Sequence, residues 1–229
     1  MSKHKIRTLV AQADIGTPEG PPALISATKD AFTQSDGKFQ VDIIINNAGV
    51  SIVNPIPEIK VADFDTSYRI NVLGPLLLIQ AAEPHLPTDR SGRIVNVSSV
   101  SSSTGFVGQS VYGGTKAALE AMTRTWAREL SERCTVNAIN PGPVLTEMYA
   151  NVTDGFVKHI RPFIEHTPLM RTRKGIDAED LCEAEPRTGG RPAYGEEVAG
   201  MVGLLCSSEA GWCTGQVVCA NGGMLFGMQ

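Results

Sequence analysis

A tyrosine and a lysine four residues apart are the side chains of this chain best suited to proton transfer. Tyr112 and Lys116 bracket the sequence YGGTK, and on a helix this spacing places both on one face. A tyrosine hydroxyl ordinarily titrates near pH ~10, and a neighbouring ammonium stabilises the phenolate and lowers its pKa. A tyrosine placed in this way can exchange a proton with an alcohol or carbonyl oxygen near neutral pH.

Three further polar elements precede this pair in the chain. Ser99 follows a β-branched run at 93–97, and side chains at strand ends project into the cleft of an open α/β sheet, where a hydroxyl can bond the same substrate oxygen. Asn71 lies in a helical pattern, and the sequence NNAG at 46–49 follows another β-branched run. Each element alone has a simpler interpretation, such as a solvated helix face, a loop hydroxyl, a helix cap or a turn. Their joint order and spacing favour one site.

Short apolar runs alternate with helical patterns along the chain. Strands are predicted at 41–45, 93–97, 135–139 and 216–220, and helices at 24–32, 62–82 with a break near Gly74 and Pro75, 111–131 and 198–206. The alternation predicts one α/β domain over 1–229 with a doubly wound parallel sheet. The run at 41–45 is expected to be buried on both faces, as in parallel sheets covered by helices. The charged segment 167–191 has no strong period and is predicted to be a surface loop, lid or insertion.

The composition narrows the class of protein. The chain has 229 residues, of which 42% are hydrophobic, and a net charge of -4 without a Lys/Arg block. A core of ordinary size is therefore expected, and a nucleic-acid or membrane partner is not. The longest apolar stretch, 72–79, is too short to span a bilayer. The five cysteines form no Cys-x-x-Cys pair and no metal-ligand spacing with the histidines, so the chain is predicted to be cytoplasmic and to hold no metal.

Taken together, the motifs resemble those of the short-chain dehydrogenase/reductase family from about residue 14 to residue 223. The matching sequences are QADI with Asp14, NNAG at 46–49, INVLG with Asn71, VNVSS with Ser99, YGGTK at 112–116, PGPVLT at 141–146 and TGQVVCANGG at 214–223. Ser99 precedes Tyr112 by thirteen residues, as is usual in that family. The resemblance implies a Rossmann-like fold, NAD or NADP as cofactor, and interconversion of a secondary alcohol and a ketone on a small organic substrate.

The resemblance also implies roles for the matching residues. Tyr112 would be the general acid/base, and Lys116 would lower its pKa and bind the nicotinamide ribose. Ser99 would hold the substrate oxygen, and Asn71 would hold a water that relays protons to Lys116. The further residues expected beside the cofactor are Asp14 and Ile15 at the adenine, Asn47, Ala48 and Gly49 on the floor, Val144 at the nicotinamide carboxamide, and Thr146 on the phosphate side. Asn46 is expected to brace the strand turn, and 221–223 to form a subunit contact.

One feature of the family has no counterpart in this sequence. The turn Thr-Gly-x3-Gly-x-Gly, which places a helix N-terminus against the pyrophosphate, is absent, and Gly105 and Gly108 lie too close together to supply it. Asp14 corresponds to the end of the family's third strand. The fold is therefore expected to be N-terminally incomplete, without the first two strands and helices, and the strand at 41–45 to form an exposed apolar edge. A non-redox isomerase, cyclase or dehydratase, or a catalytically silent binding partner, is the alternative function.

Apolar side chains suggest both a substrate class and an assembly. An apolar or aromatic substrate is suggested by Phe106, Met148, Tyr149, Phe156 and Phe163, although these residues fit packing beneath the loop equally well. A homodimer or homotetramer is predicted from the apolar residues of the helix at 111–131, Leu119, Met122, Trp126 and Leu130, and from the apolar segment 224–228, because monomers rarely expose such patches.

Overall fold

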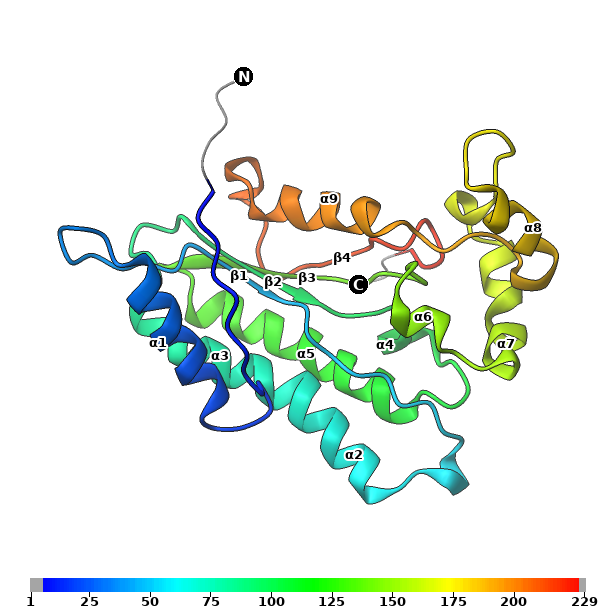
Figure 1. Ribbon diagram of the computed structural model, residues 1–229, viewed down its shortest axis with the longest axis horizontal. Helices are drawn as coiled ribbons and strands as arrows, with labels where there is room; N and C mark the ends of the chain where they lie inside the picture. The colour runs from blue at the N-terminus through cyan, green and yellow to red at the C-terminus, as the bar shows by residue number, and fades with distance from the viewer. Residues whose placement is uncertain (1–5, 227–229) are drawn as a thin grey trace.

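The fold is a parallel sheet with helices on both faces (Figure 1). The computed structural model describes residues 6–226. The strands are β1 (Ile43–Asn46), β2 (Gly92–Val97), β3 (Cys134–Ile139) and β4 (Val217–Val218), in the order β1-β2-β3-β4. Asn46 pairs with Asn96, and Val97 pairs with Ile139. The carboxyl ends of β1, β2 and β3 therefore lie side by side, and the α/β prediction is confirmed.

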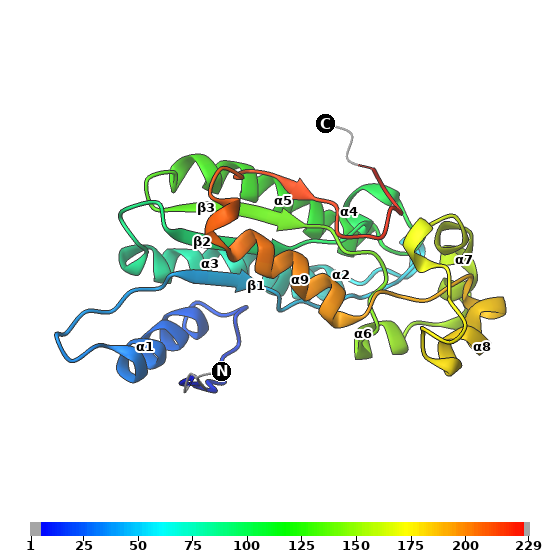
Figure 2. The same ribbon diagram turned by 90° about the horizontal axis from the view of Figure 1, so that it is seen from above.

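The helices cover the two faces unequally. They are α1 (Gly20–Phe32), α2 (Val61–Tyr68), α3 (Gly74–Ala82), α4 (Ser101–Thr104), α5 (Ser110–Glu129), α6 (Glu147–Ala150), α7 (Asp154–Glu165), α8 (Glu179–Thr188) and α9 (Gly195–Cys206). Helix α5 packs on β2 and β3, α1 packs on α3, and α9 packs on β2 and β3. Figure 2 shows α9 on the face of the sheet opposite α3 and α5.

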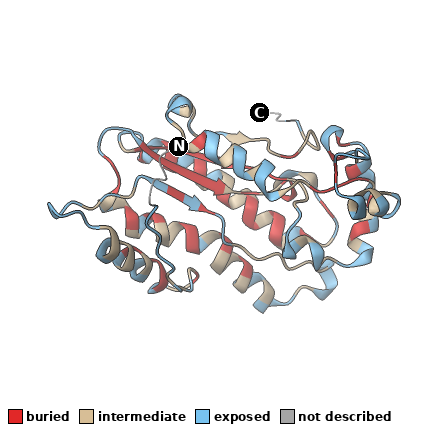
Figure 3. Cartoon of the chain, turned by 45° about the horizontal axis from the view of Figure 1, so that its top comes forward, coloured by how far each residue is buried: buried red, intermediate tan, exposed pale blue. Residues whose placement is uncertain are grey.

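Two apolar layers enclose the central strands. Ile94 and Val136 face a core shared with Leu119 and Trp126 of α5. On the other face, Val95 and Ile139 pack with residues of α9. Figure 3 shows the resulting burial of β2 and β3. Leu119 and Trp126 of α5, and Leu130 just after its end, are buried in the chain's own core, and Met122 packs against it. The prediction that they form an open apolar face is therefore wrong.

Strand β1 is buried on one face only. Ile44 is 6% exposed, whereas Ile43 and Ile45 on the other face are 48% and 47% exposed. The expectation that 41–45 is buried on both faces is wrong, because α9 packs over β2 and β3. The expected exposed apolar edge is confirmed, since β1 ends the sheet. Residues 7–15 form neither helix nor strand, and Val10 is fully open to solvent.

A π-helical stretch, Arg69–Leu73, joins α2 to α3. Its i→i+5 geometry is visible in the hydrogen bond from the Gly74 N–H to the Arg69 carbonyl. Pro75, in the first turn of α3, lacks an N–H and cannot continue the α-helical ladder. The break predicted near Gly74 and Pro75 therefore takes the form of a wider turn, and Asn71 lies inside it.

The region after β3 contains more helix than the sequence pattern suggested. Helix α8 lies within 167–191, together with a 3-10 turn at Pro168–Met170, so the segment predicted to be a surface loop, lid or insertion contains regular structure. Helix α7 buries Val157, Ile160 and Ile164. Their spacing of three and four residues is the signal that sequence analysis missed.

The C-terminal segment is held within the chain. Met224 and Leu225 pack against a cluster that contains Phe106 and Ile160. Asn221 is 3% exposed and donates to the Asn140 side chain at 3.4 Å, so the structure gives it a contact inside the chain. Gly227 and Met228, which belong to the predicted apolar segment, lie outside the described residues.

Two kinds of feature are absent from residues 6–226. None of the helices there has the length and apolar character needed to cross a membrane. Within the same range, no group of three or more His, Cys, Asp and Glu side chains is arranged to hold a metal ion.

The uneven burial of β1 predicts unequal costs for truncating neighbouring isoleucines. Ile44→Ala is expected to lower the free energy of unfolding by about 2–4 kcal/mol, because it opens a cavity in the core. Ile45→Ala is expected to lower it by about 1 kcal/mol or less, because half of the side chain is already in water. Urea unfolding of both variants measures the difference, and equal losses would contradict the one-sided burial.

Candidate active site

Tyr112 and Ser99 meet at the carboxyl end of β2. Tyr112 lies in the first turn of α5 and is 8% exposed. Burial raises the pKa of its hydroxyl, and a hydrogen bond with Ser99 opposes that rise. The Ser99 hydroxyl follows β2 and is fixed by Ser101, donating to its Oγ at 3.0 Å and accepting from its N–H at 3.1 Å. The structure therefore brings the two hydroxyls together, and their roles stay predictions.

Lys116 is a buried cation one helical turn after Tyr112. It is 4% exposed, and its Nζ donates to the carbonyl of Val97, the last residue of β2, at 2.8 Å. Burial lowers the pKa of the Lys116 ammonium to about 8. Its Nζ lies 5.7 Å from the Tyr112 ring centroid. The pKa of Tyr112 is raised by burial, and the lowering of that pKa expected from Lys116 stays a prediction.

Asn71 links three segments of the site. It is 1% exposed, and its side chain exchanges two hydrogen bonds of 2.8 Å with the backbone of Val50. Its Nδ2 also donates to Thr115 Oγ1 at 3.0 Å, and that hydroxyl donates to the Tyr112 carbonyl at 2.7 Å. The π-helical turn thus connects the loop after β1 to the start of α5. The water that Asn71 is expected to hold stays a prediction.

The NNAG turn lies directly against Lys116 and Asn71. A Cβ on Gly49 would lie 3.1 Å from Asn71 Oδ1 and 3.5 Å from Lys116 Nζ, so glycine allows the close approach. Asn47 and Ala48 are exposed, so a ligand bound over this turn could contact them. Asn46 is buried and donates to Asn96 at 2.7 Å, and Asn96 donates to Thr123 at 2.8 Å. This chain of side chains supports the bracing role expected for Asn46.

Asp14 and Ile15 lie beside the start of α3. The Asp14 carboxylate accepts from the Gly16 N–H at 2.9 Å and lies 3.3 Å from Arg69. A Cβ on Gly74 would lie 3.0 Å from the Ile15 carbonyl oxygen, so this glycine lets the segment pass closely. The structure therefore places Asp14 and Ile15 beside the π-helical stretch Arg69–Leu73, which carries Asn71, and the start of α3.

Val144 and Thr146 follow β3 on the adjacent loop. The Val100 N–H donates to the Pro141 carbonyl at 3.0 Å, which joins the loop after β2 to the loop after β3. Val144 forms a parallel bridge with Ala193. Thr146 is exposed and caps α6, where its hydroxyl accepts from the Tyr149 N–H at 3.4 Å. The loops that carry Ser99, Val144 and Thr146 thus lie side by side at the carboxyl end of β2 and β3.

The aromatic residues near this edge pack mainly on one another. Phe106 is 7% exposed and makes edge-to-face contacts with Phe156 and Phe163, at centroid distances of 6.1 Å and 5.0 Å. Tyr149 packs against the same cluster. This agrees with the packing alternative that the sequence left open. Met148 is exposed.

Gln109 is a buried residue whose side-chain amide oxygen is unsatisfied. It lies three residues before Tyr112 and is 8% exposed, yet its Oε1 has no hydrogen-bond partner among the described residues. Buried amide oxygens are usually satisfied, so this one has spare capacity to accept a hydrogen bond.

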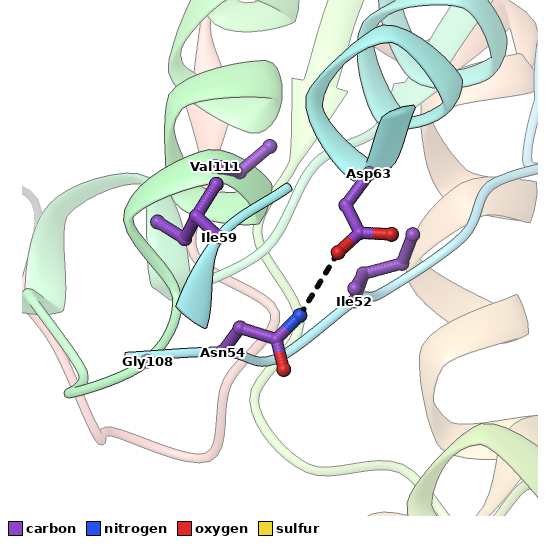
Figure 4. Close-up of a pocket in the computed structure, with 6 residues that line it drawn as sticks. All are labelled: Ile52, Asn54, Ile59, Asp63, Gly108 and Val111. Atoms are coloured by element: carbon purple, nitrogen blue, oxygen red, sulfur yellow. Dashed lines mark hydrogen bonds between the residues drawn. The ribbon is translucent and has the colours of Figure 1, made fainter. Parts of the chain in front are cut away.

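A small hollow lies beside the N-terminal end of α5 (Figure 4). Asn54 and Asp63 face each other across it and form a 3.1 Å hydrogen bond. The residues that line it are Ile52, Asn54, Ile59, Asp63, Gly108 and Val111. None of the four residues predicted to be catalytic is among them, so this hollow is separate from the Tyr112 hydroxyl.

Comparison with known proteins gives consistent matches. The profile of the short chain dehydrogenase family matches residues 2–155. The chain is 49% identical to L-xylo-3-hexulose reductase of Hypocrea jecorina and 50% identical to L-xylulose reductase of Aspergillus niger; in each case the match covers 97% of this chain and 80% of the relative. Among solved structures, it is similar to a blue fluorescent protein from a metagenomic library in complex with NADPH, with a TM-score of 0.71, 28% identity and coverage of 93% of this chain and 74% of the other.

The buried Lys116 predicts a specific dependence of stability on pH. Its pKa is about 8 in the folded chain, below the ordinary lysine value of 10.5, so between these values the unfolded state binds more protons and the free energy of unfolding rises with pH. The rise attributable to Lys116 is up to about 3 kcal/mol. Urea unfolding of the wild type and of Lys116→Met from pH 7 to pH 10 is expected to show this rise in the wild type only. Parallel curves would contradict it.

Proposed function

Because this chain belongs to the short-chain dehydrogenase family, in which its close relatives are reductases, we propose that it is an NAD(P)H-dependent reductase of a polyhydroxylated ketone. The observation that carries the proposal is the group formed by the buried Tyr112 and Lys116 with the half-buried Ser99, beside the buried Asn71. These residues supply a proton donor, a hydroxyl that fixes the substrate oxygen and a cation. No part of this arrangement requires a metal ligand.

The residues present fit the ribose and nicotinamide end of a nucleotide. Lys116 Nζ has one hydrogen-bond acceptor among the described residues, the Val97 carbonyl, although an ammonium has three donors. A diol of a ribose would satisfy the remaining donors, with Asn47, Ala48 and Gly49 as the floor and Val144 and Thr146 on the neighbouring loop. Asp14 and Ile15 would border the adenine. The sequence has no Thr-Gly-x3-Gly-x-Gly turn, so the fit concerns these contacts and not the pyrophosphate.

Within this proposal the protein residues control a single proton. A bound nicotinamide nucleotide would supply the hydride that reduces the carbonyl carbon. The Tyr112 hydroxyl donates its proton to the carbonyl oxygen, and the Ser99 hydroxyl donates a hydrogen bond to the same oxygen. Burial keeps Tyr112 protonated by raising its pKa, which suits the direction of reduction. The Lys116 cation favours the phenolate that forms.

Three observations favour a polyhydroxylated substrate over an apolar one. The relatives with the names L-xylulose reductase and L-xylo-3-hexulose reductase match 97% of this chain. The aromatic residues that suggested an apolar or aromatic substrate are occupied with one another. Gln109 supplies an unpartnered acceptor for a substrate hydroxyl. We therefore infer a keto sugar, with L-xylulose as the probe compound.

The assembly is a separate proposal. A homodimer or homotetramer stays our expectation for this chain, as closed symmetric assemblies are common. Helix α5 does not offer an apolar surface for this assembly, because its large apolar residues are buried within the chain. The remaining support is the exposed apolar surface of Ile43, Ile45 and Phe226.

Substitution of the proton donor tests the proposed reaction. Tyr112→Phe keeps the ring and removes the hydroxyl, so kcat for L-xylulose reduction is expected to fall by about 10²–10⁴-fold, the usual range for a general acid. Oxidation of NADPH and of NADH is followed separately at 340 nm. Tyr68→Phe, at a tyrosine outside the site, serves as the control and is expected to retain activity. Absence of ketone reduction in the wild-type chain, or full activity in Tyr112→Phe, would refute the proposal.

Removal of the Gln109 amide tests the substrate class. Gln109→Leu is expected to lower kcat/KM for L-xylulose by about tenfold, since a hydroxyl would lose its acceptor and a tenfold change corresponds to ~1.4 kcal/mol. The value for cyclohexanone, which has no hydroxyl, is expected to change by less than about twofold. A parallel loss with both ketones would show that Gln109 does not recognise hydroxyl groups.

A further inference from the structure

Arg191 is a charged residue buried in the region between α8 and α9. Its side chain is 5% exposed, and its Nε lies 3.1 Å from Oδ1 of Asp177, whose side chain is 1% exposed. Its two terminal nitrogens bind the two carboxylate oxygens of Glu197 at 2.8 Å each. The guanidinium also lies over the Tyr194 ring, 4.7 Å from its centroid. Charges this deeply buried are retained only when they are paired in this way.

The partners of Arg191 come from both sides of α8. Asp177 precedes α8 and also accepts a 2.7 Å hydrogen bond from the Arg173 N–H. Glu197 lies in the first turn of α9 and accepts from the Tyr194 N–H at 2.8 Å, closing a capping box. One guanidinium therefore ties the segment before α8 to the N-terminus of α9.

The backbone next to Arg191 holds the loop that carries Val144. The Ala193 N–H donates to the Pro143 carbonyl at 2.9 Å, and the Leu145 N–H donates to the Ala193 carbonyl at 2.8 Å. Ala193 thus acts as a one-residue strand that pairs with the loop after β3. The Arg191 N–H donates to the Met170 carbonyl at 2.7 Å, which fixes the other end of this short segment.

We propose that Arg191 is a positioning residue for the nucleotide. Through Ala193 it fixes the loop 143–146, whose Val144 meets the nicotinamide carboxamide and whose Thr146 lies on the phosphate side under the proposed function, on which this inference rests. The guanidinium forms hydrogen bonds with Glu197 and the Pro192 carbonyl, and an ion pair with Asp177 in which Nε lacks hydrogen-bond geometry. It contacts none of the residues assigned to the nucleotide in these interactions, so its influence passes through the backbone. Buried ion pairs contribute little net stability compared with apolar residues of the same volume. Loop placement therefore explains this network better than stability does.

A second arginine network provides a matched structural control. Arg133 is 23% exposed at its side chain and bonds Glu83 Oε1 at 2.7 Å and the carbonyls of Glu83, Leu86 and Pro87 at 2.8–2.9 Å. It lies immediately before β3, at the amino end of the strand, whereas loop 143–146 follows the carboxyl end. Arg133→Met therefore removes a comparable network at the other end of the sheet.

The test measures nucleotide recognition and loop mobility separately from stability. In Arg191→Met the KM for the preferred nucleotide is expected to rise about tenfold, with the KM for L-xylulose within about twofold. Hydrogen exchange without nucleotide is expected to quicken at Leu145 and not in β2. Arg133→Met is expected to lose unfolding free energy without either change. Arg191→Met/Asp177→Asn removes both buried charges and is expected to recover stability while the nucleotide KM stays high.

The possible failures can be told apart. A wild-type chain that reduces no ketone refutes the proposed function, whereas an active wild type with an unchanged nucleotide KM in Arg191→Met refutes the positioning role. Recovery of the nucleotide KM together with stability in the double variant also refutes it, because a purely structural role would restore both. Arg191→Lys, which keeps the charge and loses the two-pronged contact with Glu197, is the variant to use if Arg191→Met does not fold; an unchanged nucleotide KM and unchanged Leu145 exchange in it would overturn the proposal.

Discussion

The burial of one ammonium group constrains the architecture of this site. Lys116 needs a carbonyl acceptor, and the acceptor is the last residue of β2, so α5 must pass across the carboxyl end of that strand. The space around the ammonium leaves no room for a Cβ at Gly49 without tight contact with Asn71. Asn71 in turn is held in a π-helical turn that bonds both Val50 and Thr115. The loop after β1, the helix pair α2–α3 and helix α5 are thus arranged around a single desolvated charge.

Much of this arrangement could be predicted from local patterns. The β-branched runs that became β1, β2 and β3 were located to within one or two residues at most ends, because strands buried among helices have few alternatives. The side-chain order Asn71, Ser99, Tyr112 and Lys116 predicted the group that the structure brings together. The helical interruption near Gly74 and Pro75 was also visible, because proline cannot donate to the preceding turn.

Other features depended on long-range packing that a local pattern does not contain. The exposure of Ile43 and Ile45 follows from the fact that α9 packs on β2 and β3, which the composition of β1 cannot reveal. The raised pKa of Tyr112 depends on burial contributed by several segments. The network around Arg191 joins residues 177, 191 and 197 across α8. Aspartate, arginine and glutamate are also the usual residues of a solvated surface, so their types alone do not reveal the network.

The π-helical turn Arg69–Leu73 has a consequence for the two helices that it joins. Each residue of an α-helix advances the direction of its side chains by about 100°, and a π-type insertion places the following helix out of phase with the preceding one. Helix α3 can therefore direct Ile79 and Ala82 into the core, while α2 keeps its own orientation against α5. A helical wheel drawn through 61–82 as one continuous helix would mix these faces. The turn that holds Asn71 thus also changes the direction in which the following side chains point. As a result, α2 packs against α5 while α3 directs its apolar residues into the core.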